Sequence, residues 1–305
     1  MTSELQSKQI TRNIEFDIAR AVAIFLMILQ HSWLLIFSNI FDNHSWDSFF
    51  FTAGTFLVAP VFLFLMGASI HSSRRNTPRQ IFKRGLELII LGYGLSALRF
   101  YLPIILSQYL GLINSPESII YQIEPINYLL QTDILHVAGL SLIGLACFKQ
   151  IKLKLDYYLV IAFLVALASP IFSAASYVIF PFFPWFLYSL VGFYFGSMLV
   201  KSSNKFEFYK DSRSKLIPVF ILGAFLFLIN PIFSPVVYYH HGTGLSLLFI
   251  SIVIYWLSFI YFNCQKLPEK VISMFTFLSK NVTLIYIIQW LLIAWLAVFM
   301  AIRVF

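Results

Sequence analysis

The chain has 305 residues, of which 60% are apolar and only 11% are charged, and its mean hydropathy is +0.84. Soluble domains are nearer ~45–50% apolar and ~25% charged, so this composition excludes an ordinary soluble enzyme, a disordered chain and a secreted disulfide scaffold. It indicates a membrane protein, and with ~20 apolar residues per spanning helix the length allows roughly eight to eleven spans. Cys147 and Cys264 are far apart in the sequence, which favours neither a disulfide framework nor a metal site.

The first apolar run, residues 21–38, lacks an early small-residue cleavage site, so we expect a retained first helix rather than a cleaved signal peptide. Eight further apolar runs follow, near residues 50–70, 86–106, 132–148, 156–176, 182–200, 216–233, 243–262 and 282–302. The sequence therefore predicts an all-α, polytopic transmembrane helix bundle of about nine spans. We interpret residues 1–305 as a single membrane domain, with residues 1–12 as a cytoplasmic tail.

Positive charge alternates along the chain. Of the 21 Lys and Arg residues, all but Arg99 and Arg303 lie in five segments, 1–20, 71–85, 149–155, 201–215 and 264–281. Because cytoplasmic loops carry excess Lys and Arg, this pattern predicts a cytoplasmic N-terminus and, with nine spans, an external C-terminus. Orientation and anionic lipid headgroups account for the net charge of +8, so we expect no nucleic-acid partner.

Ionisable side chains inside spans are costly and are candidates for function. Asp17 and Arg20 lie at the cytoplasmic end of the first helix. The simpler interpretation is a cap and a salt bridge, and the alternative is that Arg20 faces a cytoplasmic cavity and binds an anion such as phosphate. Gln30, His31 and Ser32 cluster in the outer half of the same helix. There His31 is either a satisfied interior hydrogen bonder or part of the lining of a polar cavity.

The short outer loop after the first helix places His44 between Asp42 and Asp47. A carboxylate neighbour can orient an imidazole and strengthen it as a base, which suits general base catalysis. The alternative interpretation is a polar hairpin between two helices.

Further polar residues lie in later spans. Arg99 is expected to snorkel to the outer surface, with pairing to Asp133 in a central cavity as the alternative. Asp133 and His136 share one helix face and form either a capped helix start or a second acid/base pair. Asn281 and Gln289 in the last span are consistent with hydrogen bonds to neighbouring helices.

Motifs for phosphate loops, dinucleotide folds, hydrolase elbows and zincin sites are absent from the sequence. The adjacent His240 and His241 would face different ways on a helix, and no metal is expected. Candidate histidines lie toward the outside and candidate cations toward the inside. This polarity indicates a membrane-spanning site with an anionic donor below and an acceptor above.

Several stretches match known motifs in order. Residues 12–31, RNIEFDIARAVAIFLMILQH, follow R-x-x-x-x-D-x-x-R-G-x-A-x-x-x-M-x-x-x-[HN], with Ala21 in place of Gly. Residues 43–70, which begin NHSW, resemble H-x-S-W followed by P-x-F-x-F. Residues 280–290, KNVTLIYIIQW, resemble N-S-x-x-x-Y-x-x-H, with Gln289 in place of His. Further matches cover residues 84–92, 133–143 and 180–196.

Together these motifs resemble the bacterial branch of the heparan-α-glucosaminide N-acetyltransferase family of transmembrane acyltransferases, related to the acyltransferase 3 group. The resemblance implies transfer of an acetyl group from cytosolic acetyl-CoA to a sugar on the far side of the membrane, without a metal. It places the catalytic histidine on His44, with His31 in support and Asp42 or Asp47 orienting the base. We assign the remaining candidates to the CoA side (Asp17, Arg20, Lys83, Arg84 and Asn281) and to the acceptor side (Trp46, Asp133 and His136).

The resulting expectation is a multi-pass acetyltransferase of the bacterial inner membrane, without the N-terminal extracytoplasmic domain of the animal enzymes. One rival is a transporter or flippase of a polyprenyl- or lipid-linked sugar, although no inverted repeat is visible in the sequence. The other is a non-catalytic scaffold with the same fold. The acceptor atom, the acyl chain, direct transfer against an acetyl-histidine intermediate, and homodimerisation stay open.

Overall fold

The computed structural model describes residues 12–37, 46–110, 125–174, 180–229 and 238–304. Every regular element in these ranges is a helix, which confirms the all-α prediction. The elements are α1 (Ile14–Ser32), η1 (Trp33–Phe37), α3 (Asp47–Leu57), α4 (Ala59–Ala68), α5 (Pro78–Ser96), η2 (Ala97–Tyr101), α6 (Leu102–Tyr109), α7 (Pro125–Leu130), α8 (Ile134–Gln150), α9 (Leu155–Ala174), α10 (Phe182–Lys201), α11 (Lys205–Ile229), α13 (Thr243–Asn263), η4 (Cys264–Lys266), α14 (Glu269–Lys280) and α15 (Val282–Val304).

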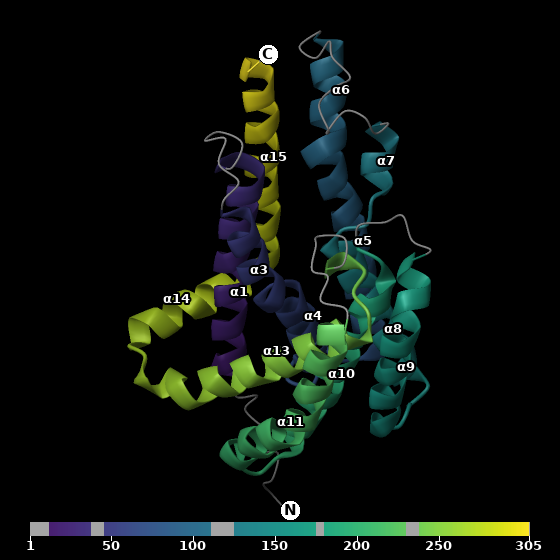
Figure 1. Ribbon diagram of the computed structural model, residues 1–305, viewed down its shortest axis with the longest axis vertical. Helices are drawn as coiled ribbons and strands as arrows, with labels where there is room; N and C mark the ends of the chain where they lie inside the picture. Colours follow the sequence, from purple (N-terminus) through teal and green to yellow (C-terminus); the bar gives the residue numbers. More distant parts are fainter. Residues whose placement is uncertain (1–11, 38–45, 111–124, 175–179, 230–237, 305) are drawn as a thin grey trace, which may run out of the picture.

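Six helical segments in the described ranges are long and apolar enough to cross a membrane, which makes the chain a multi-pass membrane protein. A seventh arises if α14 and α15, which meet at a bend of 72°, count as one span. The helices α1, α5 and α15 run along the long axis of the molecule, whereas α13 and α14 cross it at a large angle (Figure 1).

The expected spans at 50–70 and 132–148 are helical but short. α8 has 17 residues, and the first of the two segments breaks at Val58 into α3 and α4. Pro60 near the start of α4 has no backbone N–H to donate, so the hydrogen-bond ladder of α3 cannot continue through it. The expectation of nine spans thus counts apolar runs, some of which are half-length helices.

The basic segments of the sequence gather at one end of the molecule. Lys149 donates a hydrogen bond to the carbonyl oxygen of Asn76, which joins the segments 71–85 and 149–155. Nζ of Lys205 lies 2.6 Å from Oδ1 of Asn13, which joins 201–215 with 1–20. Residues of 1–20, 71–85 and 264–281 line one cavity, described below. The alternation of charge therefore predicts which loops lie together.

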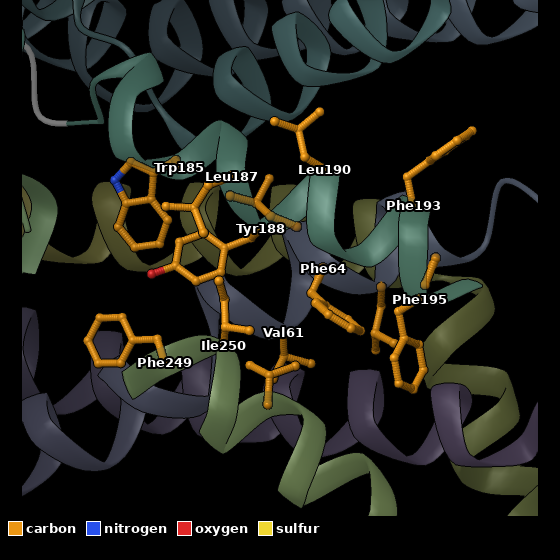
Figure 2. Close-up of a cluster of buried hydrophobic side chains, with 14 of the residues drawn as sticks. Val61, Phe64, Trp185, Leu187, Tyr188, Leu190, Phe193, Phe195, Phe249 and Ile250 are labelled. Carbon is orange, nitrogen blue, oxygen red and sulfur yellow. The ribbon is translucent and has the colours of Figure 1, made fainter. Parts of the chain in front are cut away.

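The core is built around α10, which packs closely against α4 and α9 and also contacts α13. Figure 2 shows Trp185 and Tyr188 of α10 facing Phe249 of α13, with Phe64 of α4 beside them. Close approach of α4 and α10 requires glycine, because a Cβ atom on Gly192 would lie 2.0 Å from the carbonyl oxygen of Phe64. This buried backbone contact fixes α4, which forms one wall of the cavity.

His241, one of the two histidines of the segment 238–241, belongs to this core. Nε2 of His241 lies 2.6 Å from the hydroxyl of Tyr188, and Nδ1 lies 2.7 Å from the carbonyl oxygen of Tyr238. Both ring nitrogens are therefore occupied, and Tyr238 is itself buried. The segment is held inward because Trp185 donates to the carbonyl oxygen of Tyr239 at 2.9 Å.

Candidate active site

A cavity of about 880 Å³ opens among α1, α4, α5, α8, α14 and α15. Its volume lies within the ~300–1,000 Å³ range of small-molecule sites. Its lining includes the cations Arg12, Arg20, Arg74, Arg84 and Lys280. They come from three of the basic segments, so the cavity has a strongly positive mouth. The sequence-based expectation of a cavity beside Arg20 agrees with this geometry.

Asp17 organises one wall of the mouth. Its side chain is buried and accepts hydrogen bonds from Arg12 and from Oγ of Ser279, the latter at 2.7 Å. The hydrogen bond to Asp17 raises the pKa of the Arg12 guanidinium above its ordinary value. Asp17 therefore acts as a structural acceptor, as the cap and salt-bridge interpretation predicts.

Arg20 lines the cavity but is also tied to the protein. Its Nη2 donates to the carbonyl oxygen of Leu65 at 3.1 Å and to Oγ of Ser69, and its Nη1 lies 3.8 Å from Oδ1 of Asp17. The first two contacts join α1 to α4. A ligand would meet Arg20 as a fixed positive charge whose donors are mostly in use.

Arg74 and Arg84 are two cations of the mouth that are free to bind a ligand, as is Lys280. Both are exposed, both line the cavity, and neither guanidinium forms a hydrogen bond or ion pair with another residue in the described part of the chain. Arginine forks of this kind bind phosphate oxygens in bidentate fashion. They are the strongest anion-binding groups that the geometry offers.

Two residues assigned to the CoA side stand apart from the cavity wall. The ammonium of Lys83 lies 3.9 Å from Oε1 of Glu87 on the exposed face of α5 and does not line the cavity. Nδ2 of Asn281 donates to the carbonyl oxygen of Phe277 at 2.9 Å and caps α14 at the bend. Its neighbours Lys280 and Val282 line the cavity instead.

The deep end of the cavity is closed by Tyr286 of α15. Its hydroxyl lies 2.8 and 2.9 Å from the two carboxylate oxygens of Asp133. Nη1 of Arg99 lies 2.8 Å from Oδ2 of the same carboxylate, and both charged side chains are buried. The expectation that Arg99 snorkels to the surface is wrong, because a buried carboxylate at the start of α8 holds its guanidinium inside.

Asp133 and His136 form the capped start of α8. Oδ1 of Asp133 accepts from the backbone N–H of Leu135 at 2.9 Å, and Nδ1 of His136 accepts from the backbone N–H of Asp133 at 3.0 Å. This confirms the capped-helix interpretation. Since Nδ1 is an acceptor, neutral His136 carries its proton on Nε2. That buried nitrogen has no hydrogen-bond partner among the described residues.

His31 is connected to Arg99 through an aromatic ring. Nδ1 of His31 lies 2.5 Å from Nε2 of Gln289, and its ring centroid lies 4.4 Å from that of Trp290. Cζ of Arg99 lies 4.6 Å from the Trp290 ring centroid. We call the connected set of His31, Arg99, Asp133, Tyr286, Gln289 and Trp290 the buried polar cluster.

From the sequence we assign no site role to Arg99, Tyr286, Gln289 or Trp290. One signal in the sequence was an arginine within an apolar span, which is rare without a function or a partner. A second signal appears only in the structure. Arg99 lies in η2 and His31 lies just before η1, and both of these segments are π-helical. Such π-helical turns occur frequently at functional sites.

Of the outer loop after the first helix, the described residues include only the end, from Trp46 onward. His44 and Asp42 lie outside the described residues, so their predicted roles have no structural account. Oδ1 of Asp47 accepts from Nε1 of Trp33 at 2.8 Å, which ties the start of α3 to η1. Trp46 is 53% exposed and presents its indole to the surroundings. In the described ranges no cluster of three or more metal-ligating side chains occurs.

A family model described as the heparan-alpha-glucosaminide N-acetyltransferase catalytic domain matches residues 12–235. The chain belongs to this family. The match begins at Arg12 on the cavity mouth and includes His31, Arg99 and Asp133, whereas α14 and α15 follow it. No curated protein and no solved structure gave a significant match.

Membership of the heparan-alpha-glucosaminide N-acetyltransferase family implies transferase activity in the membrane. The outer loop of this chain differs from the family motif H-x-S-W in the position of its histidine. When H-x-S-W is aligned on Trp46, Asn43 occupies the first position and His44 the second. The histidine of this chain therefore stands one residue later than the motif places it.

Proposed function

We propose that the protein is a transmembrane acetyltransferase that moves an acetyl group from cytosolic acetyl-CoA to an amine or hydroxyl of a sugar on an extracytoplasmic glycan or glycolipid. The observation that carries the proposal is a cavity with a cationic mouth whose lining includes Tyr286, the residue through which the cavity contacts the buried polar cluster. A bacterial cytoplasmic membrane is the proposed location, and the bilayer, acyl-CoA and the sugar are the proposed partners.

The positive charges of the cavity mouth indicate where the donor, acetyl-CoA, would bind. Arg84 and Arg74 would hold the phosphates of CoA, while the other cations of the mouth add positive potential. The walls between the mouth and Tyr286 include apolar side chains such as Leu88 and Leu135. This lining suits the pantetheine arm and would carry the thioester toward the cluster. Lys83 has no part in this arrangement.

The histidines indicate how the acceptor sugar would be activated. His44 would be the general base, oriented by Asp42 or Asp47, and would take the proton of the acceptor N–H or O–H as it attacks the thioester carbonyl. The C–S bond then breaks, and the CoA thiolate receives a proton. Alternatively, a histidine carries the acetyl group as a covalent intermediate. His31 supports either route, and Trp46 with Nε2 of His136 would contact the sugar.

The test uses inverted membrane vesicles supplied with acetyl-CoA that carries a radiolabelled acetyl group. Label entering glycan or lipid fractions with the wild type, and not with His44→Ala at equal expression, supports the proposal. Label transfer by Asn43→Ala is the matched comparison, because Asn43 occupies the position at which the family motif has its histidine. If neither label transfer nor CoA binding by the purified protein is found, the proposal fails and a transporter or scaffold takes its place.

A further inference from the structure

Arg99 occupies the centre of the buried polar cluster. Its guanidinium pairs with Asp133 at 2.8 Å and lies over the rings of Trp290 and Phe100 at 4.6 and 4.7 Å. Only 7% of the residue is exposed. One charged group thus contacts the start of α8, the middle of α15 and its own π-helical turn.

Each contact of Arg99 leads to a different part of the proposed reaction path. Through Asp133 it reaches the hydroxyl of Tyr286, which lines the deep end of the cavity. Through Trp290 it reaches the imidazole of His31, which packs on the indole at 4.4 Å. Tyr286 and Trp290 are four residues apart and share one face of α15. Directly or through Asp133, Arg99 thus contacts two residues on one face of α15, and one of them packs against His31 of α1.

We propose that the Arg99–Asp133 ion pair is a positioning element for acetyl transfer, which fixes Tyr286 at the cavity end and holds Trp290 against His31. The inference rests on the proposed function for its catalytic readout. Stability alone is a poor reason for the pair, because apolar replacement of a buried ion pair is often neutral or stabilising. The cap of α8 also forms without Arg99, because Asp133 accepts from the N–H of Leu135 and His136 accepts from the N–H of Asp133.

The decisive variant is the charge-neutral double substitution Arg99→Met with Asp133→Asn. Asparagine keeps a good helix cap and an acceptor for Tyr286. Because both charged groups are replaced together, no buried charge is left without a partner. We expect unchanged thermal unfolding and unchanged acetyl-CoA binding, because the cations of the mouth are untouched. The transfer kcat should fall about 100-fold with little change in the KM for acetyl-CoA, as a misplaced reactive group predicts.

The matched control removes an ion pair elsewhere by the same chemistry. Nζ of Lys215 lies 2.7 Å from Oδ2 of Asp211 on the exposed face of α11. Lys215→Met with Asp211→Asn should transfer at the wild-type rate. The conservative variant Arg99→Lys keeps a cation beside Asp133 and Trp290 and should retain more of the wild-type rate than the double variant.

A second readout does not depend on activity. Spectra of protein labelled with ¹⁵N-histidine report the tautomer and the ring environment of His31, whose signals are assigned with His31→Asn. We expect these signals to move in the Arg99→Met, Asp133→Asn variant and to stay in the control. Unmoved His31 signals, or wild-type kcat in the folded double variant, would overturn the positioning role. If the wild type transfers no acetyl group, the proposed function fails, and the histidine spectra still decide the positioning role.

Discussion

Nε2 of Gln289 lies 2.5 Å from Nδ1 of His31, so the first and last long helices of the protein meet through an amide and an imidazole. The motif that residues 280–290 resemble has histidine at the position of Gln289, and the first motif accepts Asn or His at the position of His31. The absence of a histidine at 289 therefore does not remove the imidazole from this contact, since α1 supplies it.

This contact predicts that the two groups can exchange sides. His31→Asn alone should lower kcat/KM at least ~tenfold, because the imidazole is lost and proton transfer contributes ~10²–10⁴-fold in such steps. Adding Gln289→His should return most of the activity by restoring an imidazole across from an amide. Transfer of labelled acetyl groups by the two variants and by Gln289→His alone measures this. An inactive double variant that folds and binds acetyl-CoA would contradict the exchange.

The cavity mouth predicts a specific ranking of cations in donor binding. Arg84→Gln and Arg74→Gln should each raise the KM for acetyl-CoA about 10- to 100-fold with a small effect on kcat, because a hydrogen bond to a charged group is worth ~1.5–3 kcal/mol. Lys83→Gln should have a much smaller effect, since its ammonium faces Glu87 rather than the cavity. Initial rates over a range of acetyl-CoA concentrations test the ranking. Equal effects of Lys83→Gln and Arg84→Gln would show that the placement of Lys83 is wrong.

The packing of α4 against α10 predicts a stability difference between two glycines. A Cβ atom on Gly192 would lie 2.0 Å from a backbone oxygen of Phe64, whereas one on Gly94 meets nothing within 4 Å. Gly192→Ala should therefore destabilise the protein by ~1–3 kcal/mol or more through overpacking. Gly94→Ala should be neutral or slightly stabilising, since alanine favours the helix. Thermal unfolding of the two variants in the same detergent compares them directly.

His71 predicts a pH effect on stability. Burial lowers the pKa of His71 from 6.5 to about 4, and the charges of Lys149 and Lys201 act in the same direction. As the pH falls from about 6.5 to about 4, the unfolded chain binds a proton at this residue that the folded protein does not, so its contribution to stability decreases. Well above pH 6.5 the residue is neutral in both states and contributes no pH dependence.

The measurement is the unfolding temperature of the wild type and of His71→Leu at several pH values between about 4 and 8. The difference between the two proteins cancels the other titrating groups. We expect the wild type to lose more stability than His71→Leu across the acid range, because leucine takes up no proton and keeps an apolar contact with Phe193. Parallel curves would indicate that His71 titrates in the folded protein at its ordinary pKa.

Some polar residues could be placed correctly from the sequence and others could not. Charge pattern and apolar length place Asp17 and Arg20 correctly at one end of the first helix, because both are one-dimensional patterns. The same patterns place Arg99 on the surface, since an arginine in a span can reach the interface unless a partner holds it. From the sequence, Asp133 is only the alternative partner of Arg99, and the ion pair between η2 and the residue before α8 decides between the two interpretations.

Residue order alone establishes the membrane class, the helical fold, the common end of the basic loops and the family resemblance. These properties depend on composition, hydrophobic length and short motifs, which are local along the chain. Helix packing, by contrast, places Tyr286 in the lining of the cationic cavity and brings His31 to Gln289. It does so because a polar group buried in a membrane protein takes whichever partner the packing of distant helices brings within hydrogen-bond distance.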